Sequence, residues 1–201
     1  MPHKTRETLL VSLSVPEAEQ ALDGVLVERG FERAELRPPR PPDSIARSDA
    51  RFFDVDLLQP SLSIIREWTG YSDATAWGAA LELAEGLPPA ARMEMALPPA
   101  LSVLARAISR RATVLGFAVR EKPSHLVSVV FRQGRAMDVF TAVKDRVLVG
   151  PQGQIRPSAP QEAKTYLEQW LTPYNLSPLA IETVLGERDL PSTWRLAYVH
   201  S

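Results

Sequence analysis

The sequence predicts an α+β fold built on a mainly antiparallel sheet of about five or six strands, with helices packed on one face and a C-terminal helical appendage. Three observations support this prediction. Apolar and polar residues alternate in several segments, as in strands with one buried face. Helix-start signals precede segments whose apolar residues recur at helical spacing. Residues 125–149 form three alternating segments joined by tight turns, which predicts an antiparallel meander.

The N-terminal segment predicts a strand, a helix and a second strand. Residues 8–15 alternate, and Ser14-Val-Pro-Glu17 then has the pattern of a capping box with proline in the first turn. Gly30 is placed to end the helix, and residues 31–36 follow as the second strand. Such a β-α-β unit is right-handed if its two strands are parallel.

The middle of the chain predicts a strand pair, two helices and a further strand. Residues 51–58 and 61–68 alternate around a proline near the turn. A helix is expected over 72–85, and a second helix begins at the Pro98-Pro99 pair. Residues 113–119 are apolar with β-branched side chains at their start, which favours a strand.

Residues 1–201 are interpreted as a single domain. Within it, 37–50 is expected to be a proline-rich surface loop, and 157–201 a C-terminal helical extension. A capping-box pattern predicts a helix over 158–171 in this extension. The tail is ambiguous, because residues 194–199 also fit a terminal strand.

Composition excludes several classes of protein. The 23 basic and 24 acidic side chains give a formal net charge of −1, which argues against bulk attraction to nucleic acid. The absence of cysteine excludes disulfides, thiol nucleophiles and zinc ribbons. No apolar run is long enough to span a membrane, so a soluble cytoplasmic protein is expected. Arginine greatly outnumbers lysine, which suggests a GC-rich bacterial genome.

Signatures of common enzymes are missing from the sequence. It contains no GxxxxGK[ST], GxGxxG, GxSxG, SxxK or HExxH motif. The three histidines, His3, His125 and His200, do not have the spacing of metal ligands on one helix. The sequence therefore leans against an enzyme without settling the question, and no cofactor or metal is expected.

Trp68-Thr-Gly-Tyr71 is the most site-like short segment. It places two amphipathic rings around a glycine, directly before an expected helix N-terminus. Trp and Tyr are frequent in interface hot spots, and a helix N-terminus can bind an anion. The alternative is that Trp68 packs in the core and Tyr71 covers it.

Five arginines form a second candidate site. Arg106, Arg110 and Arg111 lie on one expected helix, while Arg132 and Arg135 flank the turn of the expected hairpin. Guanidinium groups bind phosphate and carboxylate, so the two groups could form one anion-binding patch. The alternative is a solvated helix face and a charged hairpin tip.

Two pairs of carboxylates are weaker candidates. Asp54 and Asp56 share one face of a strand about 7 Å apart, a spacing that could begin a divalent-cation site. Glu82 and Glu85 are neighbours on an expected helix, where paired carboxylates could serve acid–base chemistry. The favoured alternative for each pair is a solvated strand face or a solvated helix face.

The function expected from these observations is that of a small cytosolic protein-binding module: an adaptor, an immunity-type protein or a regulatory protein. The partner is another protein or a second copy of the chain. One alternative is an enzyme or ligand sensor that uses Asp54, Asp56 and Arg106 in a pocket between sheet and helices. Another, less supported, is nucleic-acid binding through the arginine clusters. The residues expected to bind are Trp68, Tyr71, Arg106, Arg110, Arg132 and Arg135.

Overall fold

The structure, a computed structural model, describes twelve segments of the chain. They are residues 5–34, 49–68, 83, 86–88, 91, 97–120, 125–143, 146–149, 156–157, 168–169, 171–174 and 195–200. Nearly all of the predicted helix over 72–85 and of the predicted loop over 37–50 lies outside these segments; Leu83, the one described residue of that helix, is helical.

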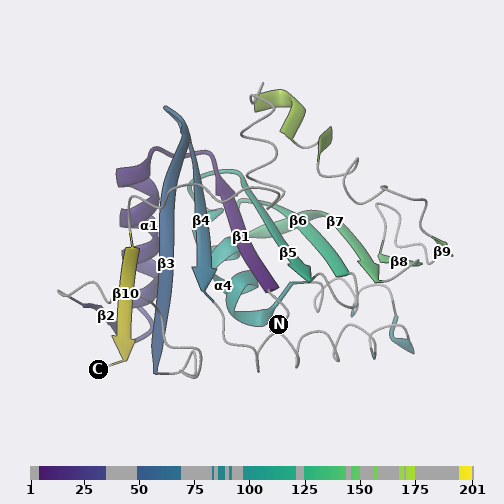
Figure 1. The fold of residues 1–201 in the computed structure, drawn as a ribbon, viewed down its shortest axis with the longest axis horizontal. Coiled ribbons are helices and arrows are strands. Elements are labelled where there is room, and N and C mark those ends of the chain that lie inside the picture. The colour runs from purple at the N-terminus through teal and green to yellow at the C-terminus, as the bar shows by residue number, and fades with distance from the viewer. Residues whose placement is uncertain are drawn as a thin grey trace.

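The described strands form one antiparallel sheet of ten strands in the order β2-β10-β3-β4-β1-β5-β6-β7-β8-β9 (Figure 1). Their bounds are β1 Thr5–Val11, β2 Phe31–Arg33, β3 Ala50–Gln59, β4 Leu62–Trp68, β5 Val114–Arg120, β6 His125–Arg132, β7 Arg135–Val143, β8 Arg146–Val149, β9 Arg156–Pro157 and β10 Arg195–His200. The predicted α+β class and antiparallel pairing are confirmed. The predicted number of strands is wrong, because short strands extend the sheet at both edges.

Two helices, α1 (Val15–Val27) and α4 (Pro99–Ile108), cover the same face of the sheet (Figure 1). Each presents one apolar stripe to it, and both stripes are buried with side chains from the central strands. Leu22 and Leu104 are fully buried from the two helices, as are Val55 and Val127 from the sheet. Burying a side chain of this size contributes roughly 1.5–3 kcal/mol, so this layer is a principal source of stability.

The capping box predicted at the start of α1 is present. The Ser14 backbone N–H donates to Glu17 Oε2 over 3.0 Å, and the Ser14 hydroxyl donates to the same oxygen over 2.5 Å. These bonds favour the ionised carboxylate and lower the pKa of Glu17. After the helix, Gly30 has a φ of 81°, a left-handed conformation that glycine adopts without strain.

Strands β1 and β2 are parallel but not adjacent. Because β10, β3 and β4 lie between them and every step is antiparallel, the four pairings from β2 to β1 restore the original direction. Helix α1 thus connects two parallel strands that have three other strands between them.

The last described strand, β10, occupies an interior position in the sheet, where it pairs with β2 on one side and β3 on the other. The prediction of a helical extension over 157–201 is therefore wrong for 195–200, and the alternative of a terminal strand is confirmed. Most of the helix predicted over 158–171 lies outside the described residues. Residues 195–200 are a strand because they pair with a strand on each side and bury Leu196 and Tyr198. The segment is too short for its own alternation to predict this.

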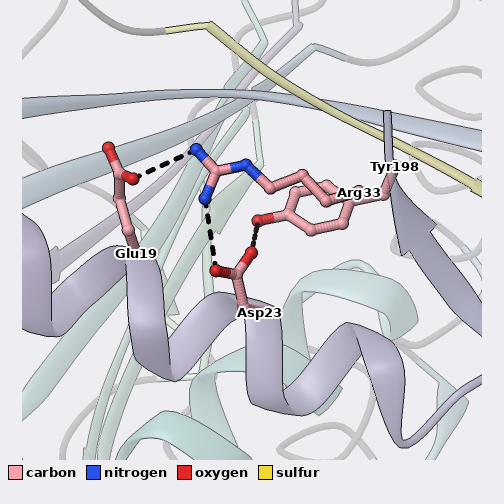
Figure 2. Close-up of polar contacts among 4 residues, drawn as sticks. All are labelled: Glu19, Asp23, Arg33 and Tyr198. Carbon is pink, nitrogen blue, oxygen red and sulfur yellow. Dashed lines mark hydrogen bonds and ion pairs between the residues drawn. The ribbon is translucent and has the colours of Figure 1, made fainter. Parts of the chain in front are cut away.

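A polar network fixes β10 to α1 and β2 (Figure 2). The hydroxyl of Tyr198, a fully buried residue, donates to Asp23 Oδ1 over 2.5 Å. Arg33 donates to Asp23 and to Glu19, each over 3.2 Å. Burial and the Asp23 carboxylate raise the pKa of Tyr198, so the phenol stays protonated and remains a donor.

The face of the sheet away from α1 and α4 is buried as well. Leu10, Ile64, Phe117, Val130 and Phe140 are all at most 2% exposed, and each alternates with residues that face the helices. The central strands are therefore apolar on both sides, which explains near-continuous runs such as Leu-Leu-Val in β1. Within the described residues, no helix combines the length and apolarity needed to cross a membrane.

Candidate functional site

The C-terminus of α4 meets the turn between β6 and β7, and Ser109 joins them. The backbone N–H of Gln133 donates to the Ser109 carbonyl over 2.8 Å. The Gly134 N–H donates to the Ser109 hydroxyl over 3.0 Å, and that hydroxyl donates to the Arg106 carbonyl over 2.9 Å. Ser109 is 2% exposed, so these bonds form away from solvent and hold the turn against the helix.

The turn itself is a two-residue hairpin connection. Gln133 and Gly134 have φ values of 52° and 76°, the left-handed pair that matches the twist of the flanking strands. A Cβ added at Gly134 would lie 3.6 Å from Arg110 Cγ, so the Arg110 side chain lies against the turn. The Gln-Gly sequence thus allows the hairpin tip to approach α4 closely.

This contact brings the turn that carries Arg132 and Arg135 against the end of α4, which carries the other predicted arginines. Because Phe131 faces the helices, Arg132 and its partner Arg135 lie on the other face of the sheet from Arg106. We call the set the arginine junction: Arg106, Arg110, Arg111, Arg132 and Arg135. Arg106 is partly buried, with its guanidinium carbon 5.6 Å from the centre of the Phe131 ring. It packs α4 onto β6 by a cation–π contact, which makes it a positioning residue for the junction.

The other four arginines of the junction are exposed. They make no ion pair with any residue in the described segments. Arg110 and Arg111 follow the C-terminus of α4, where a cation is favoured by about 0.3–1 kcal/mol. That explanation does not extend to Arg132 and Arg135, which are directly opposite each other on β6 and β7. Like charges in such a pair destabilise a hairpin.

Trp68 lies far from the arginine junction. It is the last residue of β4, opposite Phe52 of β3, and Tyr71 lies outside the described residues. One row of paired residues across β4, β1, β5 and β6 marks the hairpin end of the sheet: Ser63, Val11, Val114 and Phe131. Trp68 is five residues beyond Ser63, or about 17 Å at strand rise. The two predicted binding segments therefore do not form one site.

Asp54 and Asp56 lie on the opposite side of the sheet from Arg106. They alternate with Phe53 and Val55, which belong to the core beneath the helices. Both aspartates are buried, and Asp56 accepts a 2.5 Å hydrogen bond from Arg66 on β4. The pocket between sheet and helices expected to combine Asp54, Asp56 and Arg106 is therefore not formed, because the sheet separates them.

No metal centre is found among the described residues, where no three or more His, Asp or Glu side chains are grouped to hold an ion. Glu82 and Glu85 lie outside these residues. His200 packs edge-on against Phe31, with ring centres 5.3 Å apart, so its contact is structural.

Sequence reasoning missed a buried ion pair on the helix-covered face. Arg51 donates two hydrogen bonds to Glu67, of 2.8 and 2.7 Å, and both side chains are at most 5% exposed. The guanidinium carbon of Arg51 also lies 5.2 Å from the centre of the Phe53 ring. The signal was present, since Arg51 has the same strand parity as Phe53 and Val55. A charge at a core position indicates a buried partner.

Comparison with protein-family models, with characterised proteins and with solved structures gives no match to this chain. The geometry of its own residues is thus the basis for a functional proposal.

Proposed function

We propose that this chain is a protein-binding module of the adaptor, immunity-type or regulatory kind, and that the arginine junction is its binding surface. The observation that carries the proposal is the Ser109 contact, which holds the hairpin turn between Arg132 and Arg135 against the end of α4, where Arg110 and Arg111 follow. A surface held in place before binding loses less conformational entropy when a partner binds.

The charge distribution favours a protein partner with acidic side chains. The whole chain has a formal net charge of −1, yet four exposed arginines are concentrated at one end of the sheet. Arginine is enriched in protein interfaces and binds carboxylates through paired hydrogen bonds. A single-stranded nucleic acid generally requires a longer basic groove with aromatic side chains for stacking, and the junction has neither feature among its residues.

Site-specific crosslinking in the native host tests this function. A photoreactive amino acid at Arg135 is expected to crosslink to a discrete protein, and the product is expected to disappear when Arg110 and Arg132 are both changed to Glu. The matched control places the same group at Val27, which is 61% exposed at the end of α1. Identical products from both positions, or nucleic acid as the crosslinked species, would contradict the proposal.

A further inference from the structure

Thr113 lies directly before β5, at the end of the sheet where the hairpin turn meets α4. Its carbonyl accepts a 3.1 Å hydrogen bond from the Ser12 N–H, which continues the pairing of β1 with β5 by one residue. On the other side of β5, Val114 pairs with Phe131 of β6. The next residue of each chain toward this end of the sheet is Thr113 on one and Arg132 on the other, so these two residues lie opposite each other.

Arg132 therefore has a polar neighbour on each side. Thr113 lies beside it at the start of β5, and Arg135 lies directly opposite it on β7. Side chains at opposite positions of neighbouring strands share a face and lie about 5 Å apart. Because Val114 and Phe131 belong to the core beneath the helices, these three side chains lie on the other face of the sheet. We call them the polar row: Thr113, Arg132 and Arg135.

The polar row lies where this face of the sheet meets solvent. Leu115 and Val130, which pair with each other further along the same two strands, are at most 5% exposed. By contrast, both arginines of the row are exposed and Thr113 is partly exposed. Within the part of the chain that the structure describes, the Thr113 hydroxyl makes no hydrogen bond and the two arginines make no ion pair. One hydroxyl and two guanidinium groups can therefore contact a ligand together.

We infer that the polar row binds a phosphate group carried by a phosphorylated side chain of the partner protein. This inference rests on the proposed function and specifies its partner. A phosphorylated side chain has a charge of about −1.5 to −2 at neutral pH and three strongly accepting oxygens. Two guanidinium groups match that charge, and the Thr113 hydroxyl can donate to a remaining oxygen. A carboxylate has a single charge and two oxygens, so it would leave one of the two opposed arginines without compensation.

The exposure of the row favours a phosphate attached to a protein over a small phosphorylated molecule. A site for a small molecule encloses most of its ligand. Both arginines of the polar row are exposed, and the hairpin turn between them is at the end of the sheet. A phosphate presented from the surface of another protein can reach such a site, and the surrounding protein contacts then provide the rest of the affinity.

Fluorescence anisotropy with defined peptides tests the inference. Three fluorescein-labelled octapeptides share an alternating glutamate and valine sequence and differ at one central glutamate, which is kept, replaced by serine or replaced by phosphoserine. The phosphoserine peptide is expected to bind at least tenfold more tightly than the other two. Phenyl phosphate is expected to displace it only at concentrations at least a hundredfold above the peptide Kd. Displacement at concentrations near that Kd would overturn the assignment to a phosphorylated protein.

Two double variants with the same change in charge locate the phosphate. R132E/R135E is expected to abolish the preference for phosphoserine. R110E/R111E, at the end of α4, is the matched control and is expected to weaken all three peptides while keeping the preference. Thr113→Val should reduce the preference at least threefold, and Thr113→Ser, which keeps the hydroxyl, should restore it. The circular dichroism spectrum of each variant is expected to match that of the wild type.

The outcomes separate this inference from the proposed function. If the glutamate peptide binds through the arginines but phosphoserine adds no affinity, the phosphate inference is refuted and the arginine junction stands as a binding surface. A preference for phosphoserine that persists in R132E/R135E would also overturn the inference. If none of the three peptides binds better than a version with lysine in place of every glutamate, both the inference and the proposed function fail.

Discussion

Replacing Ser109 by alanine perturbs the contact that holds the arginine junction together, without removing an arginine. The hydroxyl makes two hydrogen bonds in a site that is 2% exposed: it accepts from Gly134 and donates to Arg106. The backbone bond from Gln133 to the Ser109 carbonyl is retained in the variant. The change therefore loosens the turn but leaves the hairpin in place.

The expected cost follows from these two bonds. A neutral hydrogen bond contributes a net 0.5–1.5 kcal/mol, roughly, and a buried donor left without an acceptor costs about 1–3 kcal/mol. Gly134 is partly exposed, so water can replace part of what its N–H loses. We expect the free energy of unfolding to fall by about 1–2 kcal/mol.

Urea unfolding followed by circular dichroism measures this loss, and amide hydrogen exchange locates it. The Gly134 amide should exchange faster in Ser109→Ala, and binding of an acidic peptide should weaken although every arginine remains. The matched control is Ser102→Ala on the same helix, where the side chain is partly exposed. A loss below about 0.3 kcal/mol with unchanged Gly134 exchange would refute the role given to Ser109.

Three other predictions concern the fold. Arg51→Met should cost about 3–5 kcal/mol by chemical denaturation because it removes both Arg51 hydrogen bonds from the buried Glu67 carboxylate, whereas the R51M/E67M double variant should recover most of that loss. Tyr198→Phe should cost about 1.5 kcal/mol in the same assay, since Asp23 keeps its Arg33 contact; no loss would contradict the network of Figure 2. The Ser14 bonds lower the pKa of Glu17, so they stabilise the fold above the usual glutamate pKa of about 4.5 and lose this effect as pH falls. In urea unfolding from pH 7 to pH 3, the free energy of unfolding of Glu17→Gln should therefore lie below that of the wild type at pH 7 and converge on it at pH 3.

Much of the fold could be predicted because its signals are local. The capping box at Ser14, the proline start of α4 and the Gln133-Gly134 turn each depend on a few adjacent residues, and each is present. The strands that the prediction did not count depend on distant pairing. Strand β2 has three residues and β10 has six, and the two meet from opposite ends of the sequence. No local pattern shows that β10 enters the sheet between β2 and β3.

The candidate site could be predicted in part for the same reason. The two arginine groups were visible in the sequence, but the approach of the turn to α4 runs through the carbonyl and the hydroxyl of Ser109, a single small residue with no motif. Arg106, which was expected to bind a ligand, is partly buried and lies against Phe131. Asp54 is separated from Arg106 because the helices cover the other face of β3. Alternation in the sequence shows that β3 has two faces, but it does not show which of them the helices cover.

The most direct test of the central claim is the NMR spectrum of the ¹⁵N-labelled protein during titration with an acidic octapeptide of alternating glutamate and valine. The account predicts that amide shifts are concentrated at Ser109 and at residues 132–137, and that they vanish in R132E/R135E. It also predicts no comparable change at Trp68, which lies about 17 Å away in the strand direction alone, with β1 and β5 between its strand and β6. Shifts centred on Trp68, or an unchanged spectrum at saturating peptide, would contradict the assignment of the arginine junction as the binding surface.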